Sequence, residues 1–191
     1  MTDDPRRFCP LCASALEQRE INGFERPACS ESDCGFVFWD NPIPVVAGIV
    51  EHEGKLVFAR NALWPEGMYG LVTGFLEPRE TPEDGIVREV AEELGIETRI
   101  TTFVGAYGFA RKNQLLLAYH LVGEGEITLD PELVDYFHVE KSKAEYWPGG
   151  TGLAVRDWLR TQGFDPQPRE LPEAVQQWMK APPKDDSRIS G

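Results

Sequence analysis

Residues 74–96 read GFLEPRETPEDGIVREVAEELGI, and this stretch decides how the rest of the chain is interpreted. Thr81 is followed by Pro82 and, three residues after the threonine, by Asp84. This pattern begins helices, because the three residues suit the capping position and the first turn. Gly95 commonly ends a helix, since glycine adopts the left-handed conformation without strain. The sequence therefore predicts an acidic helix between these two signals.

Three glutamates of this predicted helix fall near one face. Glu89 and Glu93 are four residues apart and Glu92 is three from Glu89, so their like charges repel one another. Carboxylate oxygens suit Mg²⁺ or Mn²⁺ better than zinc, so the cluster predicts a site for these ions. Arg88 lies four residues before Glu92 and can orient that carboxylate, while Gly74 would let a backbone carbonyl approach the metal. The alternative is an exposed acidic helix with ordinary ion pairs.

The stretch resembles the Nudix box. This resemblance implies the Nudix fold, an α/β/α sandwich with a mixed sheet, and a hydrolase that uses Mg²⁺ or Mn²⁺ to split a nucleoside diphosphate linked to another moiety. It makes Glu89 and Glu93 the principal metal ligands, Glu92 a further ligand or general base, and Glu80 a supporting ligand. Together with Arg88, the first three are the candidate catalytic residues. The matched positions are Gly74, Glu80, Arg88, Glu89, Val90, Glu92, Glu93, Gly95 and Ile96.

All four cysteines lie near the start of the chain, at positions 9, 12, 29 and 34. Two closely spaced pairs of this kind predict a tetrahedral zinc site on a zinc ribbon, with Cys9, Cys12, Cys29 and Cys34 as ligands. A ribbon of about 35 residues cannot bury enough core to fold alone, so we expect the zinc to be structural. Two disulfides or a redox-active Cys-x-x-Cys motif are the alternatives.

Composition limits the partners. The chain has 191 residues, 41% of them hydrophobic, and a net charge of −13. This charge argues against non-specific binding to nucleic acid or to an anionic membrane surface. Without a long apolar run or a signal-peptide core, we expect a cytoplasmic protein with a small-molecule nucleotide substrate. The predicted domains are a zinc ribbon (1–40), a Nudix hydrolase domain (41–165), and a C-terminal helix with a disordered tail (166–191).

Outside the box, the chain from residue 9 to about 163 is similar to the NADH pyrophosphatase branch of the family. The similarity includes Asp-Pro-Glu-Leu at 130–133 and Tyr-Trp-Pro-Gly-Gly at 146–150. It implies that Glu132 is an extra metal ligand, with Asp135 as the next candidate, and that the protein can form a homodimer. A plain loop carboxylate is the alternative for Glu132.

One segment departs from that branch. Its members that hydrolyse NADH carry a Ser-Gln-Pro-Trp-Pro-Phe-Pro array, where this chain has GAYGFARKN at 105–113. Specificity for nicotinamide dinucleotides is therefore not implied. Tyr107 and Phe109 could stack on a base, Arg111 and Lys112 could bind a phosphate, and Phe75 could form another wall of the pocket. The alternative is that these rings belong to the core and that the cations are solvated.

The remaining pattern predicts strands at 45–50, 56–59, 68–72, 98–107 and 114–122 and helices at 151–161 and 173–179. His52, His120 and His138 occur singly in the sequence and are expected to be packed or exposed, not catalytic. The predicted activity is cleavage of the diphosphate in a compound such as ADP-ribose, FAD or NAD(H). The alternative is a non-catalytic Nudix module that senses such a nucleotide, which the complete box argues against.

Overall fold

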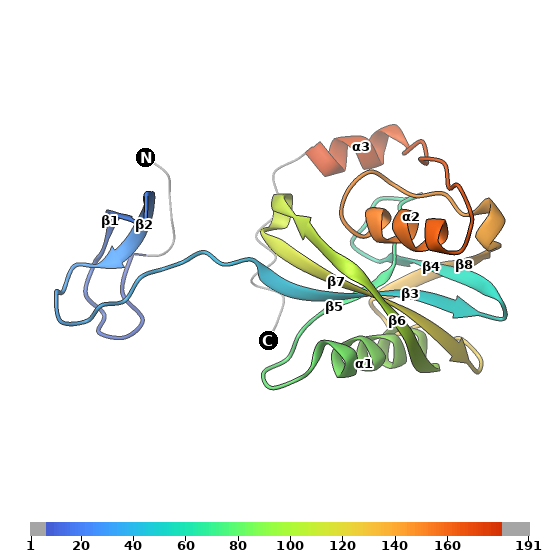
Figure 1. Cartoon of the computed structure of the whole chain (residues 1–191), viewed down its shortest axis with the longest axis horizontal. Coiled ribbons are helices and arrows are strands. Elements are labelled where there is room, and N and C mark those ends of the chain that lie inside the picture. Colours follow the sequence, from blue (N-terminus) through green and yellow to red (C-terminus); the bar gives the residue numbers. More distant parts are fainter. Residues whose placement is uncertain (1–6, 181–191) are drawn as a thin grey trace. The chain divides into compact units, whose positions relative to one another are not determined.

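The computed structural model describes residues 7–180, and the chain divides between Asn41 and Pro42 into two compact units (Figure 1). The predicted disordered tail, 181–191, lies outside the described residues. The first unit contains the antiparallel hairpin of β1 (Leu16–Ile21) and β2 (Phe24–Cys29). Asn22 and Gly23 form its turn with positive φ angles of 56° and 80°, the conformation that a tight two-residue hairpin turn requires.

The second unit is built on a sheet in which β7 (Gln114–Glu124) and β3 (Ile43–His52) run parallel and all other neighbours run antiparallel. The strand order is β6-β7-β3-β4-β8, and β5 pairs with β3 beside this path. The other strands are β4 (Lys55–Asn61), β5 (Val72–Phe75), β6 (Glu97–Phe109) and β8 (Leu133–Val139). The sheet is therefore mixed, as predicted.

Helices cover both faces of this sheet. Figure 1 shows α1 (Pro82–Leu94) on one face and α2 (Thr151–Thr161) on the other, with α3 (Glu173–Lys180) near α2. Short 3₁₀ turns follow β6 and β8 at Ala110–Lys112 (η1) and Lys141–Lys143 (η2). The core is correspondingly divided into two clusters. Ile86 and Val90 of α1 belong to one, and Trp158 and Leu159 of α2 belong to the other. The predicted α/β/α sandwich is confirmed.

The ends of α1 follow from local sequence. The Thr81 side chain accepts a hydrogen bond from the backbone N–H of Asp84, and Pro82 occupies the first turn. Gly95 ends the helix in the left-handed conformation, with φ of 68°. These capping interactions fix where the helix begins and ends.

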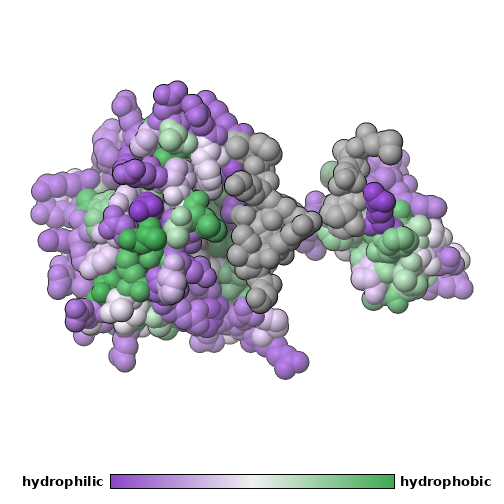
Figure 2. All heavy atoms as spheres, turned by 180° about the vertical axis from the view of Figure 1, so that it is seen from behind, coloured by the Kyte–Doolittle hydropathy of each residue, from purple (hydrophilic) through white to green (hydrophobic). Residues whose placement is uncertain are grey.

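The strand predicted at 68–72 is wrong in position. Within that stretch Gly70 makes one bridge, to Ala59, and the regular strand begins only at Val72. The reason is non-local, because the hydrogen-bonding partner of this segment is the first half of β3, and Gly74 lies opposite Val46 there. The face of the molecule seen in Figure 2 is largely hydrophilic with scattered hydrophobic side chains.

Candidate active site

The glutamates of α1 differ sharply in burial. Glu93 is only 7% exposed and Glu89 is partly buried, whereas the Glu92 side chain is 57% exposed. Because the three residues lie at positions i, i+3 and i+4 of the helix, they point in neighbouring but different directions, and Glu93 faces inward while Glu92 faces solvent. The acidic face predicted from spacing therefore contains groups in three different environments.

Arg88 connects this helix to the segment before it. Its guanidinium donates two hydrogen bonds to the Glu80 carboxylate, through Nε at 2.8 Å and Nη2 at 3.0 Å. Nη1 donates to Glu89 and to Glu92, each at 2.9 Å, and Nη2 also donates to the backbone carbonyl of Phe75 at 3.2 Å. The predicted contact with Glu92 is confirmed, and the contacts with Glu80 and Glu89 were not predicted. The Arg88 hydrogen bonds lower the pKa of Glu80 to about 2.

Burial raises the pKa of Glu93 to about 8, and the charges of Glu89, Asp130, Glu132 and Glu92 add to the effect. Burial also raises the pKa of Glu89, although Arg88 opposes the shift. These interactions place Glu132 among the acids of α1, although it lies well outside that helix in sequence. A buried carboxylate surrounded by others is costly to ionise unless a cation is bound nearby.

Asp130 positions Glu132 and was not among the sequence candidates. Its carboxylate accepts hydrogen bonds from the backbone N–H groups of Glu132 at 2.9 Å and Leu133 at 3.2 Å. Its own N–H donates to the carbonyl of Glu93. An aspartate before a proline is a common turn signal that could have identified this role from sequence. Asp135 is engaged differently, since it accepts a hydrogen bond from the Tyr69 hydroxyl.

Gly74 also makes room for a carboxylate of α1, which its sequence context did not suggest. A Cβ atom built at this position would overlap the carboxylate of Glu89, which lies directly over the glycine. Any side chain at residue 74 would therefore displace Glu89 from its place between α1 and β5. The glycine shapes the site by allowing one specific carboxylate to approach the strand.

The arrangement of box, sheet and helices agrees with comparison to known proteins. A family model described as NUDIX domain matches residues 42–159. The chain belongs to this family.

Its relatives include a Stutzerimonas stutzeri protein named NAD-capped RNA hydrolase NudC, 28% identical over 142 residues, which are 72% of this chain and 50% of that protein. NAD-capped RNA hydrolase NUDT12 of Pongo abelii is 30% identical over 178 residues, covering 81% of this chain and 38% of that protein. The chain thus spans at most about half the length of these curated relatives. A NUDIX hydrolase crystal structure from Nitrosomonas europaea shares the fold, with a TM-score of 0.67 and 21% identity over 84% of this chain and 96% of that one.

The Nudix box acids suit a hard divalent cation. The charged groups that raise the pKa of Glu93 are carboxylates, and its burial makes a neutralising cation favourable. Mg²⁺ or Mn²⁺ fits these carboxylate oxygens better than zinc, because hard cations prefer oxygen ligands. Two other groups of possible metal ligands occur among the described residues. One is formed by the four cysteines, and the other by His52, Glu53 and His138.

The predicted substrate-binding aromatics lie on the α2 side. Tyr107 packs against the cluster that contains Trp158, and its hydroxyl donates to Asp157 at 3.2 Å. Phe109, two residues farther along β6, contacts the turn before α2, since a Cβ at Gly150 would lie 3.8 Å from its ring. The contact of Tyr107 with the core favours the alternative in which the ring packs, while Phe109 is partly buried near Gly150.

The other predicted recognition residues also have defined surroundings. Arg111 is engaged with α3, because its guanidinium lies over the Trp178 ring at 4.8 Å and donates to the Trp178 carbonyl. Lys112 lies beside it on η1. Phe75 is 46% exposed next to Gly74, and its carbonyl is bound to Arg88. Phe75 is therefore linked to the carboxylate site through the hydrogen bond that Arg88 donates to its backbone carbonyl.

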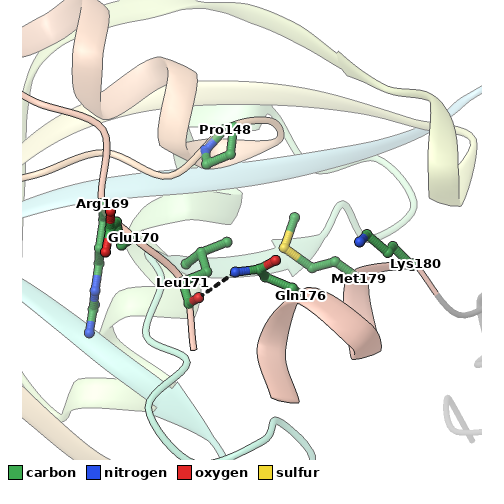
Figure 3. Close-up of a pocket in the computed structure, with 7 residues that line it drawn as sticks. All are labelled: Pro148, Arg169, Glu170, Leu171, Gln176, Met179 and Lys180. Atoms are coloured by element: carbon green, nitrogen blue, oxygen red, sulfur yellow. Dashed lines mark hydrogen bonds between the residues drawn. The ribbon is translucent and has the colours of Figure 1, made fainter. Parts of the chain in front are cut away.

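A hollow of about 440 Å³ lies between α3 and the segments on either side of α2 (Figure 3). Gln176 Nε2 donates to the carbonyl of Leu171 across part of its wall. No residue of the Nudix box lines it, so it is separate from the carboxylate site. The residues that line it are Pro148, Arg169, Glu170, Leu171, Gln176, Met179 and Lys180.

The four cysteines of the first unit converge. Their sulfur atoms all lie within 4.8 Å of one another, with Cys9 and Cys34 at 3.6 Å and Cys12 and Cys29 at 3.4 Å. None is joined in a disulfide. Four thiolates around a tetrahedral zinc ion would have their sulfur atoms about 3.8 Å apart, so this cluster fits zinc with small adjustments.

The structure also provides information on membrane-spanning helices and on the three histidines. Within residues 7–180, no helix is long and apolar enough to cross a membrane. His52 and His138, whose proximity the sequence did not predict, are within hydrogen-bonding distance of each other. His120 packs its ring against Trp158 at a centroid distance of 4.2 Å, which agrees with the expectation of a packed side chain.

Proposed function

We propose that this chain hydrolyses the diphosphate linkage of a nucleoside diphosphate joined to another moiety, using Mg²⁺ or Mn²⁺. The observation that carries the proposal is the buried carboxylate of Glu93, whose pKa is raised to about 8. A group in this environment is poorly suited to a structural ion pair but well suited to hold a divalent cation. Membership of the NUDIX family and relatives named as NAD-capped RNA hydrolases support the same reaction class.

Glu89, Glu93 and Glu132 are the residues that would hold the cation. When bound, such a cation neutralises charge on the diphosphate and lowers the pKa of a coordinated water. Glu93 contributes a deeply placed negative charge. Glu89 is fixed between Gly74 and Arg88, and Glu132 is fixed by the Asp130 turn. Each carboxylate is thereby held in place before substrate arrives, which reduces the reorganisation needed for catalysis.

Glu92 is the best placed of the box acids to accept a proton from the attacking water. It is the most exposed of the three helix glutamates, and a single hydrogen bond to Arg88 orients it. Addition of water across the P–O–P linkage would give two phosphate monoesters, with the water proton passing to this carboxylate. Arg88 and Glu80 act as positioning residues, because Glu80 holds Arg88 and Arg88 donates to Glu89 and Glu92.

The substrate is proposed by class only: ADP-ribose, FAD, NAD(H), or the same linkage at the end of an RNA. The relatives named as NAD-capped RNA hydrolases justify including the last compound. The net charge of −13 favours the small molecules, because a nucleic-acid chain would be repelled.

The test is a substrate panel with Mg²⁺ or Mn²⁺ in which products are identified by mass. We expect two phosphate monoester products from at least one of the four compounds. Glu93→Gln should reduce the rate by at least about a thousandfold, whereas Glu97→Gln, an exposed carboxylate beyond α1, should not. Binding of ADP-ribose without cleavage under every metal condition would favour the sensing module instead.

A further inference from the structure

A pair of histidines lies at the end of the sheet where β3 turns into β4, away from the Nudix box. His52 is the last residue of β3 and His138 belongs to β8. The Nδ1 atom of His52 is 2.9 Å from Nε2 of His138. Glu53, in the β3–β4 turn, completes a group whose ligand atoms all lie within 4.8 Å of one another. The proposed reaction uses none of these three residues.

The other ring nitrogen of His52 fixes its tautomer. Nε2 lies 2.8 Å from the carbonyl oxygen of Gly125, which can only accept a hydrogen bond, so Nε2 carries the proton. Nδ1 therefore presents a lone pair toward His138. A histidine that binds a metal usually donates its second N–H to a carbonyl or carboxylate in this way. The backbone thus holds His52 in the form that can coordinate a metal.

The spacing of the rings is also that of two metal ligands. The imidazole centroids are 5.2 Å apart, with an angle of 27° between the ring planes. Two imidazoles bound to one tetrahedral zinc ion at about 2.0 Å would have centroids about 5 Å apart and nitrogens about 3.3 Å apart. The nitrogens need to separate by only a few tenths of an ångström to admit the ion.

Glu53 occupies a position that the turn itself does not favour. His52 pairs with Lys55, so the hairpin turn consists of Glu53 and Gly54, whose φ angles are 53° and 75°. Turns of this type prefer asparagine, aspartate or glycine at the first position, because other side chains are strained there. Here a glutamate is held in the left-handed conformation beside two imidazoles. Metal binding by its carboxylate would account for this choice of residue.

We propose that His52, Glu53 and His138 bind one transition-metal ion of the zinc type, with water completing the coordination. Two imidazole nitrogens and one carboxylate form a borderline donor set that suits zinc and is distinct from the all-oxygen set of the Nudix box. His52 is buried, His138 is partly buried and Glu53 is exposed, so the ion can enter from the Glu53 side. The ion would join the β3–β4 turn to β8.

The experiment is a zinc titration of the purified full chain, after zinc has filled the cysteine site and with saturating Mg²⁺ to occupy the box acids. Free zinc is followed by competition with a chromophoric chelator. We expect the parent to bind one zinc equivalent beyond the cysteine site. His138→Gln should abolish this equivalent without loss of diphosphate hydrolysis. Glu140→Gln, an exposed carboxylate just after β8, is the matched control and should retain it.

The variant Glu53→Gly distinguishes a role of Glu53 in metal binding from a role in the hairpin turn. Glycine suits the left-handed position better than glutamate, so this variant should fold at least as well as the parent while binding the extra zinc at least about tenfold more weakly. The proposal is overturned if the parent binds no zinc beyond the cysteine site, which would leave an N–H···N hydrogen bond between two histidines. It is equally overturned if His138→Gln binds the extra zinc with unchanged affinity.

Discussion

Replacing Glu93 with glutamine should stabilise the second unit at alkaline pH while it abolishes activity. The pKa of Glu93 is raised from an ordinary value of 4.5 to about 8, chiefly by burial. A raised pKa means that the favourable contribution of this group is complete below its unfolded pKa and is lost as the pH rises through its folded pKa. In protein free of Mg²⁺ and Mn²⁺, the parent should therefore lose stability as the solution becomes alkaline.

The size of the effect follows from the same shift. As the pH rises from about 5.5 to 8.5, a carboxylate with these two pKa values lowers the free energy of unfolding by about 3 kcal/mol. An uncharged glutamine causes no such loss. For a chain of this size each kcal/mol changes the melting temperature by about 2–4 °C. The melting temperature of Glu93→Gln should thus gain about 6–12 °C on the parent over this pH range.

The measurement is thermal unfolding followed by tryptophan fluorescence, with zinc retained in the cysteine site and no other divalent ion added. Adding Mg²⁺ at alkaline pH should raise the melting temperature of the parent much more than that of the variant. Glu97→Gln is the control, and its melting temperature should follow the parent at every pH. If Glu93→Gln also follows the parent, then Glu93 ionises as an ordinary exposed carboxylate and the reasoning about its burial is refuted.

Gly74→Ala should lower kcat by at least about a hundredfold, because the added Cβ displaces the Glu89 carboxylate; Gly108→Ala, where a Cβ meets nothing within 4 Å, should leave kcat unchanged. Phe109→Ala should lower the melting temperature by several degrees and change KM less than about threefold, since the ring packs near α2; a tenfold rise in KM at unchanged melting temperature would restore the ring to substrate recognition. Cys12→Ser should remove one zinc equivalent by elemental analysis and disorder the β1–β2 amide signals in NMR spectra, and full zinc content with intact signals would contradict the Cys₄ site.

Local sequence was sufficient for α1 and the cysteine cluster. The caps at Thr81 and Gly95 act within one turn, so the helix ends could be predicted without knowledge of the rest of the fold. The cysteine spacing likewise predicted a group of four sulfurs, because short knuckles keep each pair together.

The features that could not be predicted from the sequence depend on contacts between residues far apart in the chain. Alternation along β6 places Tyr107 and Phe109 on the same face, but only the position of α2 shows that this face packs inward. Similarly, His52 and His138 meet because β3 and β8 both flank β4, a relation that depends on strand order. The different environments of the box acids also depend on tertiary contacts, since Asp130 and Glu132 come from outside the helix.

The hydrogen bonds of Arg88 exhaust its capacity as a donor. A guanidinium has five N–H groups, and Arg88 directs them to five acceptors: both oxygens of Glu80, one each of Glu89 and Glu92, and the carbonyl of Phe75. No N–H remains for a phosphate oxygen unless one of these bonds breaks. Although Arg88 lies next to Glu89 in sequence, its guanidinium is occupied by protein acceptors. In the proposed reaction, the negative charge of the diphosphate is then left to the bound cations, because Arg88 is already engaged by protein acceptors.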